Sequence, residues 1–373
     1  MSLRDLFRRR RRRPLRALQV EITSRCTRRC AVCPRTPLQG EWQEGDLSLA
    51  LWRILAQDLG LAEHVHLQGW GEPLLHPSLP GWAREARQAG CTVGITTNGD
   101  LLADAASDWL LRGDVDKVVI SLAGDAARQR NLRDGSCLET LLEAGGRLES
   151  RARQLGIRLR VAGSYLLTRS NAADLAQVVR LSARAGLHEV FVVHLDCPTS
   201  SLQLQQCAFA GDSLVEGMAT HLDEAESMAR EWGIRYRSPA REARDLVVCS
   251  QDPERFAFVG WDGKVAPCVN MLLPGIDVLP RWTDTSAINV APTWYGRLQD
   301  ASLKDLLESS ARRRFTAPFQ KRRAAERRFI STLMAGLDDG LCRLEEADAI
   351  RMADLAANPF PDSCRGCPKV LGW

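Results

Sequence analysis

Short apolar, β-branched segments alternate with amphipathic helical segments from Leu18 to about residue 200. This alternation is typical of repeated βα units, in which parallel strands pair into one sheet and helices cover it. We expect six strands, at residues 18–22, 64–68, 91–97, 117–122, 157–167 and 189–195. Helical patterns lie between them at residues 47–59, 79–90, 138–156 and 172–186. Six units are too few for the usual eight-stranded closed barrel, so the pattern predicts an α/β fold with a partial (β/α)6 TIM-like barrel.

The pattern changes after about residue 200, where a polar helical region begins. Residues 256–268, FAFVGWDGKVAPC, alternate around Asp262-Gly263, which is a signal for a two-residue β-hairpin. An arginine-rich helical segment at residues 303–335 and a terminal CRGCP follow. We therefore expect three parts: a basic N-terminal arm at 1–16, the partial barrel at 17–235, and a smaller irregular C-terminal domain with a β-hairpin and helices at 236–373.

Length and composition indicate a globular protein with a substantial core, since 45% of the 373 residues are hydrophobic. No apolar run approaches the length of a membrane helix, and the N-terminus lacks the apolar centre of a secretory signal. We expect a cytoplasmic protein without a membrane partner. The net charge is +4, and consecutive arginines occupy residues 8–13. Such a run can contact nucleic acid or an acidic membrane surface, but without interleaved aromatic residues we favour a solvated arm and expect no nucleic-acid partner.

Twelve cysteines are too sparse in a chain of this length for a disulfide scaffold, and we expect them to be reduced. Closely spaced cysteines therefore indicate metal binding. Those without a close partner in the sequence are expected to be small buried hydrophobic residues: Cys91, Cys137, Cys197, Cys207 and Cys342. The remaining seven fall into two groups.

The first group, Cys26, Cys30 and Cys33, has the spacing C-x3-C-x2-C and directly follows the first expected strand. In folds built from parallel strands, ligands bind at the C-terminal ends of the strands, where this loop is expected. Thiolates suit zinc or iron–sulfur clusters. A closed zinc site or a fully ligated cluster takes four protein ligands, so three cysteines leave one metal position free for a substrate or cofactor.

This triplet resembles the cysteine motif of the radical S-adenosylmethionine (radical SAM) superfamily. The resemblance implies that the three thiolates hold three irons of a [4Fe–4S] cluster, and that S-adenosylmethionine (SAM) chelates the fourth iron through its amino and carboxylate groups. The family's motif has an aromatic residue before its last cysteine, and that residue packs near the adenine. This chain has Val32 at the corresponding position.

A second segment, GWGEP at residues 69–73, follows the second expected strand and resembles the family's Gly-Gly-Glu segment, which receives the methionine amino group. Trp70, Gly71 and Glu72 occupy its three positions. Glycine allows close backbone approach, and a carboxylate suits an ammonium group. Without the preceding strand and the cysteine loop, the same segment would indicate only a turn.

Two more strand ends, TTNG at 96–99 and SLAG at 121–124, resemble segments that contact the ribose and methionine of the cofactor in the family. The resemblance implies cofactor contacts for Thr97, Asn98 and Ser121. Alternatively, Asn98-Gly99 shapes a turn and Ser121 caps a helix. Asn171, after the fifth strand, likewise lies where related sequences have asparagine, or caps the helix that follows.

The second cysteine group consists of Cys249, Cys268, Cys364 and Cys367. Four thiolates can complete a closed zinc site or a fully ligated cluster. A hairpin that ends in cysteine, followed later by C-x2-C, resembles the SPASM and twitch extensions of radical SAM maturases and dehydrogenases. The resemblance implies one auxiliary [4Fe–4S] cluster, because the sequence lacks the further cysteines of a full SPASM domain.

The resemblance spans residues of about 18 to 367 and implies reductive cleavage of SAM to a 5′-deoxyadenosyl radical, which abstracts hydrogen from a substrate. We expect a peptide or protein maturase that takes its electron from a donor such as flavodoxin or ferredoxin. A radical SAM dehydrogenase or cofactor-biosynthesis enzyme that acts on a small molecule is the alternative. A non-enzymatic iron–sulfur or zinc protein would leave Glu72 and the three-cysteine site unexplained.

Overall fold

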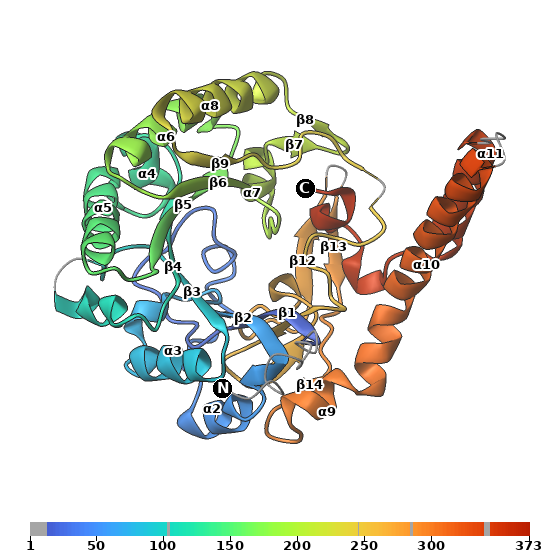
Figure 1. Ribbon diagram of the computed structural model, residues 1–373, viewed down its shortest axis with the longest axis horizontal. Coiled ribbons are helices and arrows are strands. Elements are labelled where there is room, and N and C mark those ends of the chain that lie inside the picture. The colour runs from blue at the N-terminus through green and yellow to red at the C-terminus, as the bar shows by residue number, and fades with distance from the viewer. Residues whose placement is uncertain (1–12, 103–104, 245, 284–285, 339–343) are drawn as a thin grey trace.

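One curved sheet of ten strands, most of them parallel, forms the centre of the molecule. The computed structural model describes residues 13–102, 105–244, 246–283, 286–338 and 344–373 (Figure 1). Parallel strands follow one another in chain order across the sheet: β1 (Leu15–Val20), β2 (Ala62–Leu67), β3 (Thr92–Thr97), β4 (Lys117–Leu122), β5 (Arg160–Leu167) and β6 (Glu189–His194). Each overlaps one of the six expected strands, so the partial (β/α)6 barrel is confirmed.

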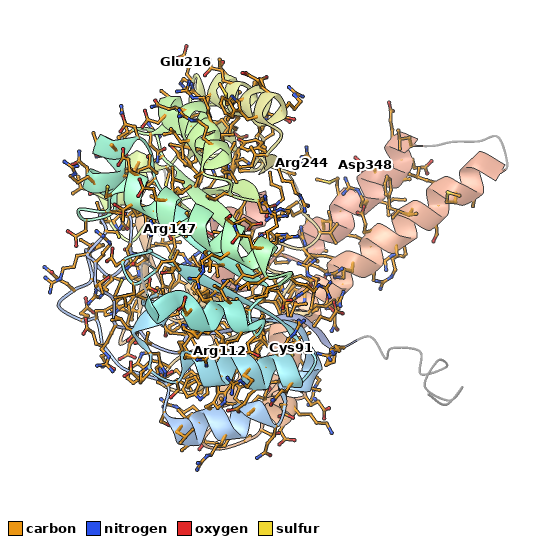
Figure 2. All side chains as sticks on the ribbon, turned by 60° about the vertical axis from the view of Figure 1, so that its left-hand side comes forward. Cys91, Arg112, Arg147, Glu216, Arg244 and Asp348 are labelled. Atoms are coloured by element: carbon orange, nitrogen blue, oxygen red, sulfur yellow. The ribbon has the colours of Figure 1, made fainter. Side chains whose placement is uncertain are left out.

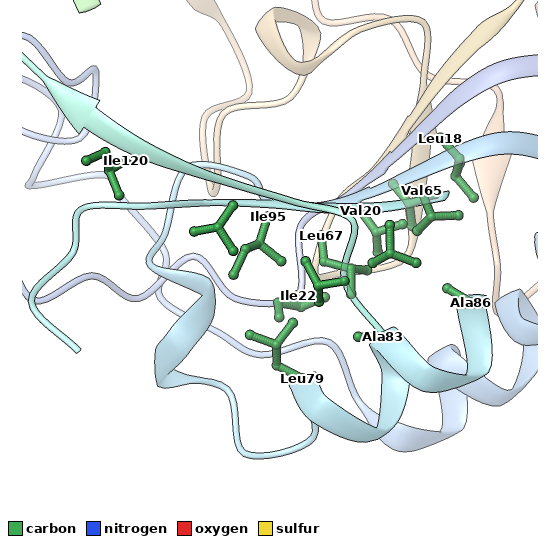
Figure 3. Packing of buried hydrophobic residues seen from close by; sticks show 14 of the residues in the cluster. Leu18, Val20, Ile22, Val65, Leu67, Leu79, Ala83, Ala86, Ile95 and Ile120 are labelled. Atoms are coloured by element: carbon green, nitrogen blue, oxygen red, sulfur yellow. The ribbon is translucent and has the colours of Figure 1, made fainter. Parts of the chain in front are cut away.

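Helices cover the outer face of these strands (Figure 1). They are α2 (Leu49–Ala56), α3 (Leu79–Gln88), the 3-10 helix η3 (Ala105–Arg112), α4 (Ala126–Leu132), α5 (Leu138–Gln154) and α6 (Leu175–Arg184). Figure 3 shows apolar side chains of β1 to β4 packed beside α3, where Ala83 and Ala86 allow the helix to approach closely. Leu18, Val20 and Leu67 are fully buried in this layer. Their burial fixes the strands and therefore the loops at the C-terminal ends of the strands.

The C-terminal region extends the same sheet beyond β1. β10 (Phe256–Val259) pairs in parallel with β1, and β11 (Lys264–Ala266) and β14 (Gly296–Arg297) follow as antiparallel strands. At the opposite edge, β9 (Arg235–Arg237) pairs in parallel with β6. The division of the chain at residue 235 stays a prediction, because the sheet is continuous across the proposed boundary.

The hairpin between β10 and β11 differs from the expected two-residue type. The Gly260 N–H donates to Lys264 O (2.9 Å), so residues 261–263 form a three-residue connection. The Gly263 N–H donates back to Gly260 O (2.9 Å), and Gly263 has a left-handed φ of +82°. A three-residue hairpin loop ends in such a glycine, whereas a two-residue Asp-Gly turn needs a positive φ at Asp262 as well, and Asp262 does not have one.

Further helices and two small sheets complete the fold. They are α7 (Ser201–Gln206), β7 (Phe209–Ala210), β8 (Ser213–Leu214), α8 (Met218–Trp232), β12 (Leu279–Trp282), β13 (Ala287–Val290), α9 (Leu303–Leu307), α10 (Ser310–Asp338) and α11 (Leu344–Ala357). The expected arginine-rich helical segment is confirmed as α9 and α10. Helices α10 and α11 lie side by side and project from the body (Figure 2).

Two features of the sequence fall outside the described residues, namely the arginines at positions 8–12 and Cys342. Arg13 is described, and its guanidinium donates to Ala89 O (3.2 Å) next to β3. Among the helices of the described ranges, none combines the length and the apolar character that crossing a membrane requires.

The side chain of Asn171 is fully buried and joins the ends of β4 and β5. Its Nδ2 donates to Ala123 O (3.1 Å) and Leu166 O (2.8 Å), and its Oδ1 accepts the N–H of Thr168 (2.8 Å). Asn171 stands at the N-cap position of the 3-10 helix Ala172–Asp174, as considered, but its side chain makes no capping bond to that helix. The amide is instead a junction between the loops after two strands.

Replacing Asn171 with alanine should lower the free energy of unfolding by about 2–4 kcal/mol, because buried backbone groups lose their partners. Urea denaturation of the variant measures this loss. Asn131→Ala, an exposed change on α4, is the matched control and should stay within about 0.5 kcal/mol of the parent. Equal effects of the two substitutions would contradict the structural role of Asn171.

Candidate active site

The cysteine loop lies at the C-terminal end of β1. Cys30 is 8% exposed, Cys26 and Cys33 are half-buried, and all three line one cavity of about 280 Å³, named here the strand-end cavity. Burial raises the pKa of each thiol, and it raises the pKa of Cys33 to about 12. Neutral thiols at pH 7 become thiolates together when a cation binds among them, which releases their protons.

Buried side chains hold the backbone of this loop. The guanidinium of Arg35, a residue that is 9% exposed, donates to Cys26 O (3.3 Å). Gln203, from α7, donates through Nε2 to Cys33 O (3.0 Å). Val32, which stands where the family has an aromatic residue, is 5% exposed and also lines the strand-end cavity. The loop therefore has a fixed shape that turns its thiols toward the cavity.

Glu72 lies in the same cavity and is 1% exposed. Its Oε1 accepts hydrogen bonds from the Leu74 N–H (3.0 Å) and the Thr97 hydroxyl (2.9 Å), and its Oε2 accepts the Asn98 N–H (2.7 Å). Burial raises the pKa of Glu72 to about 7, while these hydrogen bonds act in the opposite direction. A carboxylate fixed in this way is oriented to receive a cationic donor such as an ammonium group.

Two glycines allow the Glu72 segment to pass close to the cysteine loop. A Cβ on Gly71 would lie 2.3 Å from Thr23 O, and a Cβ on Gly69 would lie 2.3 Å from Glu21 Cβ. Only glycine fits at these two positions. Trp70, between them, lines the cavity, but its indole Nε1 donates to Leu272 O (2.9 Å). Trp70 therefore links the cavity wall to the C-terminal region.

Thr97 and Asn98 support Glu72 as well as lining the cavity. The Thr97 hydroxyl donates to Glu72 and accepts the Gly99 N–H (2.9 Å), so its only proton is already engaged. Asn98 accepts the Asp100 N–H (3.0 Å) through Oδ1, and Gly99 has a φ of +86°. The turn considered for Asn98-Gly99 is therefore present, and Asn98 lines the cavity as well.

Ser121, at the end of β4, also lines the cavity. In the part of the chain that the structure describes, its hydroxyl makes no hydrogen bond, and its carbonyl accepts one from Gln129 Nε2 (3.2 Å). The N-terminus of α4 is capped by Asp125, whose side chain accepts the Arg128 N–H (2.9 Å). The capping role considered for Ser121 is therefore wrong, and its hydroxyl is available to a ligand.

The cavity wall after β6 was not predicted from the sequence. His194, Asp196 and Cys197 all line the cavity. Cys197, expected to be only a small buried residue, is 8% exposed and lies within electrostatic range of Cys268 and Cys367. It therefore lies between the two cysteine groups. The rule that ligands bind at strand ends, applied to the sixth strand as well, would have identified this segment.

His194 and Asp196 each contact a different segment of the chain, His194 through a hydrogen bond and Asp196 through an ion pair. His194 Nε2 lies 3.0 Å from Ala240 O, and burial lowers the pKa of the imidazole, so the neutral ring donates through Nε2. Its buried Nδ1 is then an acceptor, and it has no partner among the residues that the structure describes. Asp196 forms an ion pair with Lys369, close to the C-terminal cysteines.

The remaining isolated cysteines divide into two kinds. Cys91 and Cys207 are at most 1% exposed, as expected of small core residues. Cys137 is exposed, which contradicts the expectation, because it lies at the surface where α5 begins.

The second cysteine group also comes together in space, from the loop before β10, the end of β11 and the C-terminal turn: Cys249, Cys268, Cys364 and Cys367. Each thiol of this group lies within electrostatic range of the other three, and burial raises the pKa of every one, that of Cys268 to about 12. Arg281, on β12, is 6% exposed and donates to Ser363 O (2.6 Å) and Arg365 O (2.9 Å). These bonds fix the turn that holds the last two cysteines.

Within the described ranges, no group of three or more His, Cys, Asp or Glu side chains converges closely enough to hold a single metal ion. In a four-iron cluster each thiolate binds a different iron, so the thiolates need not converge on one point. The spread of the thiols in each cysteine group is therefore compatible with a four-iron cluster.

Sequence comparison relates residues 20–182 to one family model, that of the Radical SAM superfamily. The tungsten-containing aldehyde ferredoxin oxidoreductase cofactor-modifying protein of Pyrococcus furiosus is 28% identical over 263 residues, which cover 69% of this chain and 72% of that protein. The PqqA peptide cyclase of Gluconobacter oxydans is 26% identical over 263 residues, which cover 68% of this chain and 70% of that protein.

Solved structures show the same fold. Streptococcus suis SuiB bound to S-adenosylmethionine matches with a TM-score of 0.54 at 13% identity, over 70% of this chain and 61% of SuiB. Native anSMEcpe with bound AdoMet matches with a TM-score of 0.53 at 14% identity, over 80% of this chain and 82% of that chain. The chain thus spans about three fifths of the length of SuiB.

Glu21, directly after β1, connects the Glu72 segment to the β10–β11 hairpin. Its Oε1 accepts the Trp70 N–H (2.8 Å), and its Oε2 accepts the Trp261 N–H (3.4 Å). Glu21 is 2% exposed, and burial raises its pKa to about 8. The carboxyl group therefore carries a proton in the folded protein at pH values where the unfolded chain has already lost it.

Folding stability should accordingly fall as pH rises from about 4.5 to about 8, because the folded state binds more protons than the unfolded state across this window. Glu21→Gln removes this titration, so the variant should lose about 2–4 kcal/mol less than the parent between pH 5 and pH 9. Denaturant unfolding of the metal-free proteins measures both slopes. Glu41→Gln, at an exposed position, should keep the parental slope. Parallel curves for the parent and Glu21→Gln would refute the assignment.

Proposed function

We propose that Cys26, Cys30 and Cys33 hold a [4Fe–4S] cluster and that SAM binds at the iron they leave free, because this chain belongs to the radical SAM superfamily. One observation supports this most strongly: the three thiols and the Glu72 carboxylate line a single cavity at the C-terminal ends of the strands. The chain is a radical SAM enzyme, and the roles of its residues follow from their positions in this cavity.

The residues around the cavity fit this cofactor pair. Three soft thiolate ligands suit iron, and the fixed carboxylate of Glu72 suits the ammonium group of SAM. Buried polar atoms normally have hydrogen-bond partners. The His194 Nδ1 has none among the described residues, and a donor group on a bound ligand would supply one. The Ser121 hydroxyl is likewise available, and Val32 and Leu195 provide an apolar wall.

When bound, the cluster and SAM supply a reductive cleavage that yields a 5′-deoxyadenosyl radical. The protein's part is to orient the cofactor and to exclude water and competing hydrogen donors. Thr97 and Asn98 hold Glu72 in one orientation through both of its oxygens, so the ammonium group meets a preorganised acceptor. Gly69 and Gly71 bring this carboxylate close to the cysteine loop.

We also propose that the second cysteine group holds an auxiliary [4Fe–4S] cluster. Its four thiols come from segments far apart in the sequence, and two of them, Cys364 and Cys367, are 7% and 8% exposed. A complete set of four protein ligands leaves no metal position for a substrate. The cluster is therefore expected to carry electrons or to stabilise the region, and Cys197 lies between it and the cavity.

The substrate is proposed to be a peptide or protein side chain. The PqqA peptide cyclase relative supports this, and SuiB, which shares the fold, has been solved bound to its precursor peptide SuiA. The cofactor-modifying relative from Pyrococcus furiosus supports the alternative, a dehydrogenase or cofactor-biosynthesis enzyme that acts on a small molecule. In either case a flavodoxin or ferredoxin is proposed as the electron donor, and a cytoplasmic location stays a prediction.

Anaerobic reconstitution should load about eight irons per chain, four in each cluster, and reduction with SAM present should release 5′-deoxyadenosine. The variant with Cys26, Cys30 and Cys33 all replaced by alanine should lose about half the iron and all of the product. It should keep the electron paramagnetic resonance spectrum of the second cluster. Product formation by this variant, or zinc in place of iron in the parent protein, would overturn the proposed function.

Glu72→Gln should weaken SAM binding to the cluster-loaded protein by about 10- to 100-fold, because a neutral amide replaces the carboxylate that receives the ammonium group. Anaerobic equilibrium dialysis with radiolabelled SAM measures the change. Glu41→Gln, which removes an exposed carboxylate, is the control and should bind SAM as the parent does. Unchanged affinity in Glu72→Gln would show that the ammonium group binds elsewhere.

A further inference from the structure

A second hollow opens on the surface beside the auxiliary cysteines, between the start of β1, the loop before β10 and helix α10. It has a volume of about 470 Å³ and is named here the Cys249 cleft. Its lining consists of Arg16, Val247, Val248, Cys249, Ser250, Asp252, Arg323, Glu326 and Arg327. The cleft shares no lining residue with the strand-end cavity, so it leads to the second cysteine group by a separate route.

Cys249 is the only member of the second cysteine group among the residues that line this cleft. Cys249 and Cys268 are half-buried, whereas Cys364 and Cys367 are 7% and 8% exposed, and of the two half-buried thiols only Cys249 lines this cleft. The cleft is therefore the place where a proposed cluster ligand meets the surface. Electron transfer between proteins needs a short path from the cofactor to the surface, and Cys249 provides one.

The charged groups of the cleft leave two arginines without an acidic partner. Arg323 forms ion pairs with Asp252 (2.6 Å) and Glu254 (2.7 Å), and Glu326 forms one with Arg351 (3.5 Å). Arg16 and Arg327 are exposed, and no carboxylate of the described residues lies within 4.0 Å of either. The rim of the cleft thus presents unpaired positive charge, which attracts an acidic surface and accelerates its association.

Helix α10 continues this surface beyond the cleft. Ile330 and Met334 follow Arg323 and Arg327 at spacings of three and four residues, so all four lie on one face of the helix. Ile330 is 51% exposed and Met334 is 58% exposed. Arginine and methionine are enriched at protein interfaces, and an apolar stripe beside unpaired charge suits a protein rather than a small anion. The stripe runs along the helix that projects from the body in Figure 2.

We propose that the Cys249 cleft and this face of α10 form the docking site of an acidic one-electron carrier protein, such as a flavodoxin. The carrier gives up one electron, which the second cluster accepts, and no atom is transferred. This inference rests on the proposed auxiliary cluster. Transient electron-transfer complexes have small interfaces, and a cleft rimmed by charged side chains suits a complex of this kind.

The test uses the cluster-loaded full chain and a purified, fluorescently labelled flavodoxin, with binding followed by anisotropy under anaerobic conditions. The double variant Arg16→Glu with Arg327→Glu should bind flavodoxin at least about tenfold more weakly at low ionic strength, and the difference should shrink at high salt. Ile330→Ala, which removes apolar contact area and adds no charge, should weaken binding with the parental salt dependence. Arg147→Glu, on α5 away from this surface (Figure 2), reverses the same charge and should bind as the parent does.

Iron content and the spectrum of the second cluster are recorded for every variant before binding is measured. A parent protein without the second cluster would overturn the proposed auxiliary cluster, and this inference with it. A parent protein that holds the cluster, together with a double variant that binds flavodoxin normally, would overturn the docking site alone. Loss of self-association in the double variant, with flavodoxin binding unchanged, would assign the surface to a second copy of the chain and would also overturn this inference.

Discussion

The two halves of this molecule depend on one strand and on the carboxyl group that follows it. β1 pairs in parallel with β2 on one side and with β10 on the other, so it belongs to both the barrel and the C-terminal region. Directly after β1, the buried side chain of Glu21 accepts the N–H groups of Trp70 and Trp261. The cysteine loop begins a few residues later. The Glu72 segment, the hairpin that leads to Cys268 and the first cysteine group are therefore positioned from a single point.

The number of thiols gives the two cysteine groups different chemistry. In the first group, three thiols share a cavity with a carboxylate that is held through both oxygens, and the cavity retains polar atoms that no described residue satisfies. In the second group, four thiols lie near one another, and Arg281 on β12 fixes the turn that holds Cys364 and Cys367. An incomplete ligand set suits exchange with a cofactor, and a complete set suits electron storage.

The parallel strands and the first cysteine group could be predicted from the sequence, because periodicity and close residue spacing are local signals. The second group comes from segments far apart in the sequence, and only the resemblance to the SPASM and twitch extensions brought its members together. The pairing of β10 with β1 could not, since it joins segments more than 230 residues apart that carry no shared local pattern. The hairpin loop was one residue longer than expected because Asp262 does not adopt a positive φ. The strand-end rule would have placed Cys197 at the cavity, but its proximity to the second group depends on how the C-terminal turn folds back toward β6.

We propose that one chain builds an open cluster site and a closed one. Diffraction data collected at the iron absorption edge, from crystals grown anaerobically with SAM, locate both sites in one experiment. We expect two separate iron clusters, one beside Cys26, Cys30 and Cys33 with the amino group of SAM next to Glu72, and one enclosed by the second cysteine group. Iron at one site only, anomalous signal at the zinc edge instead, or SAM bound away from Glu72 would contradict it.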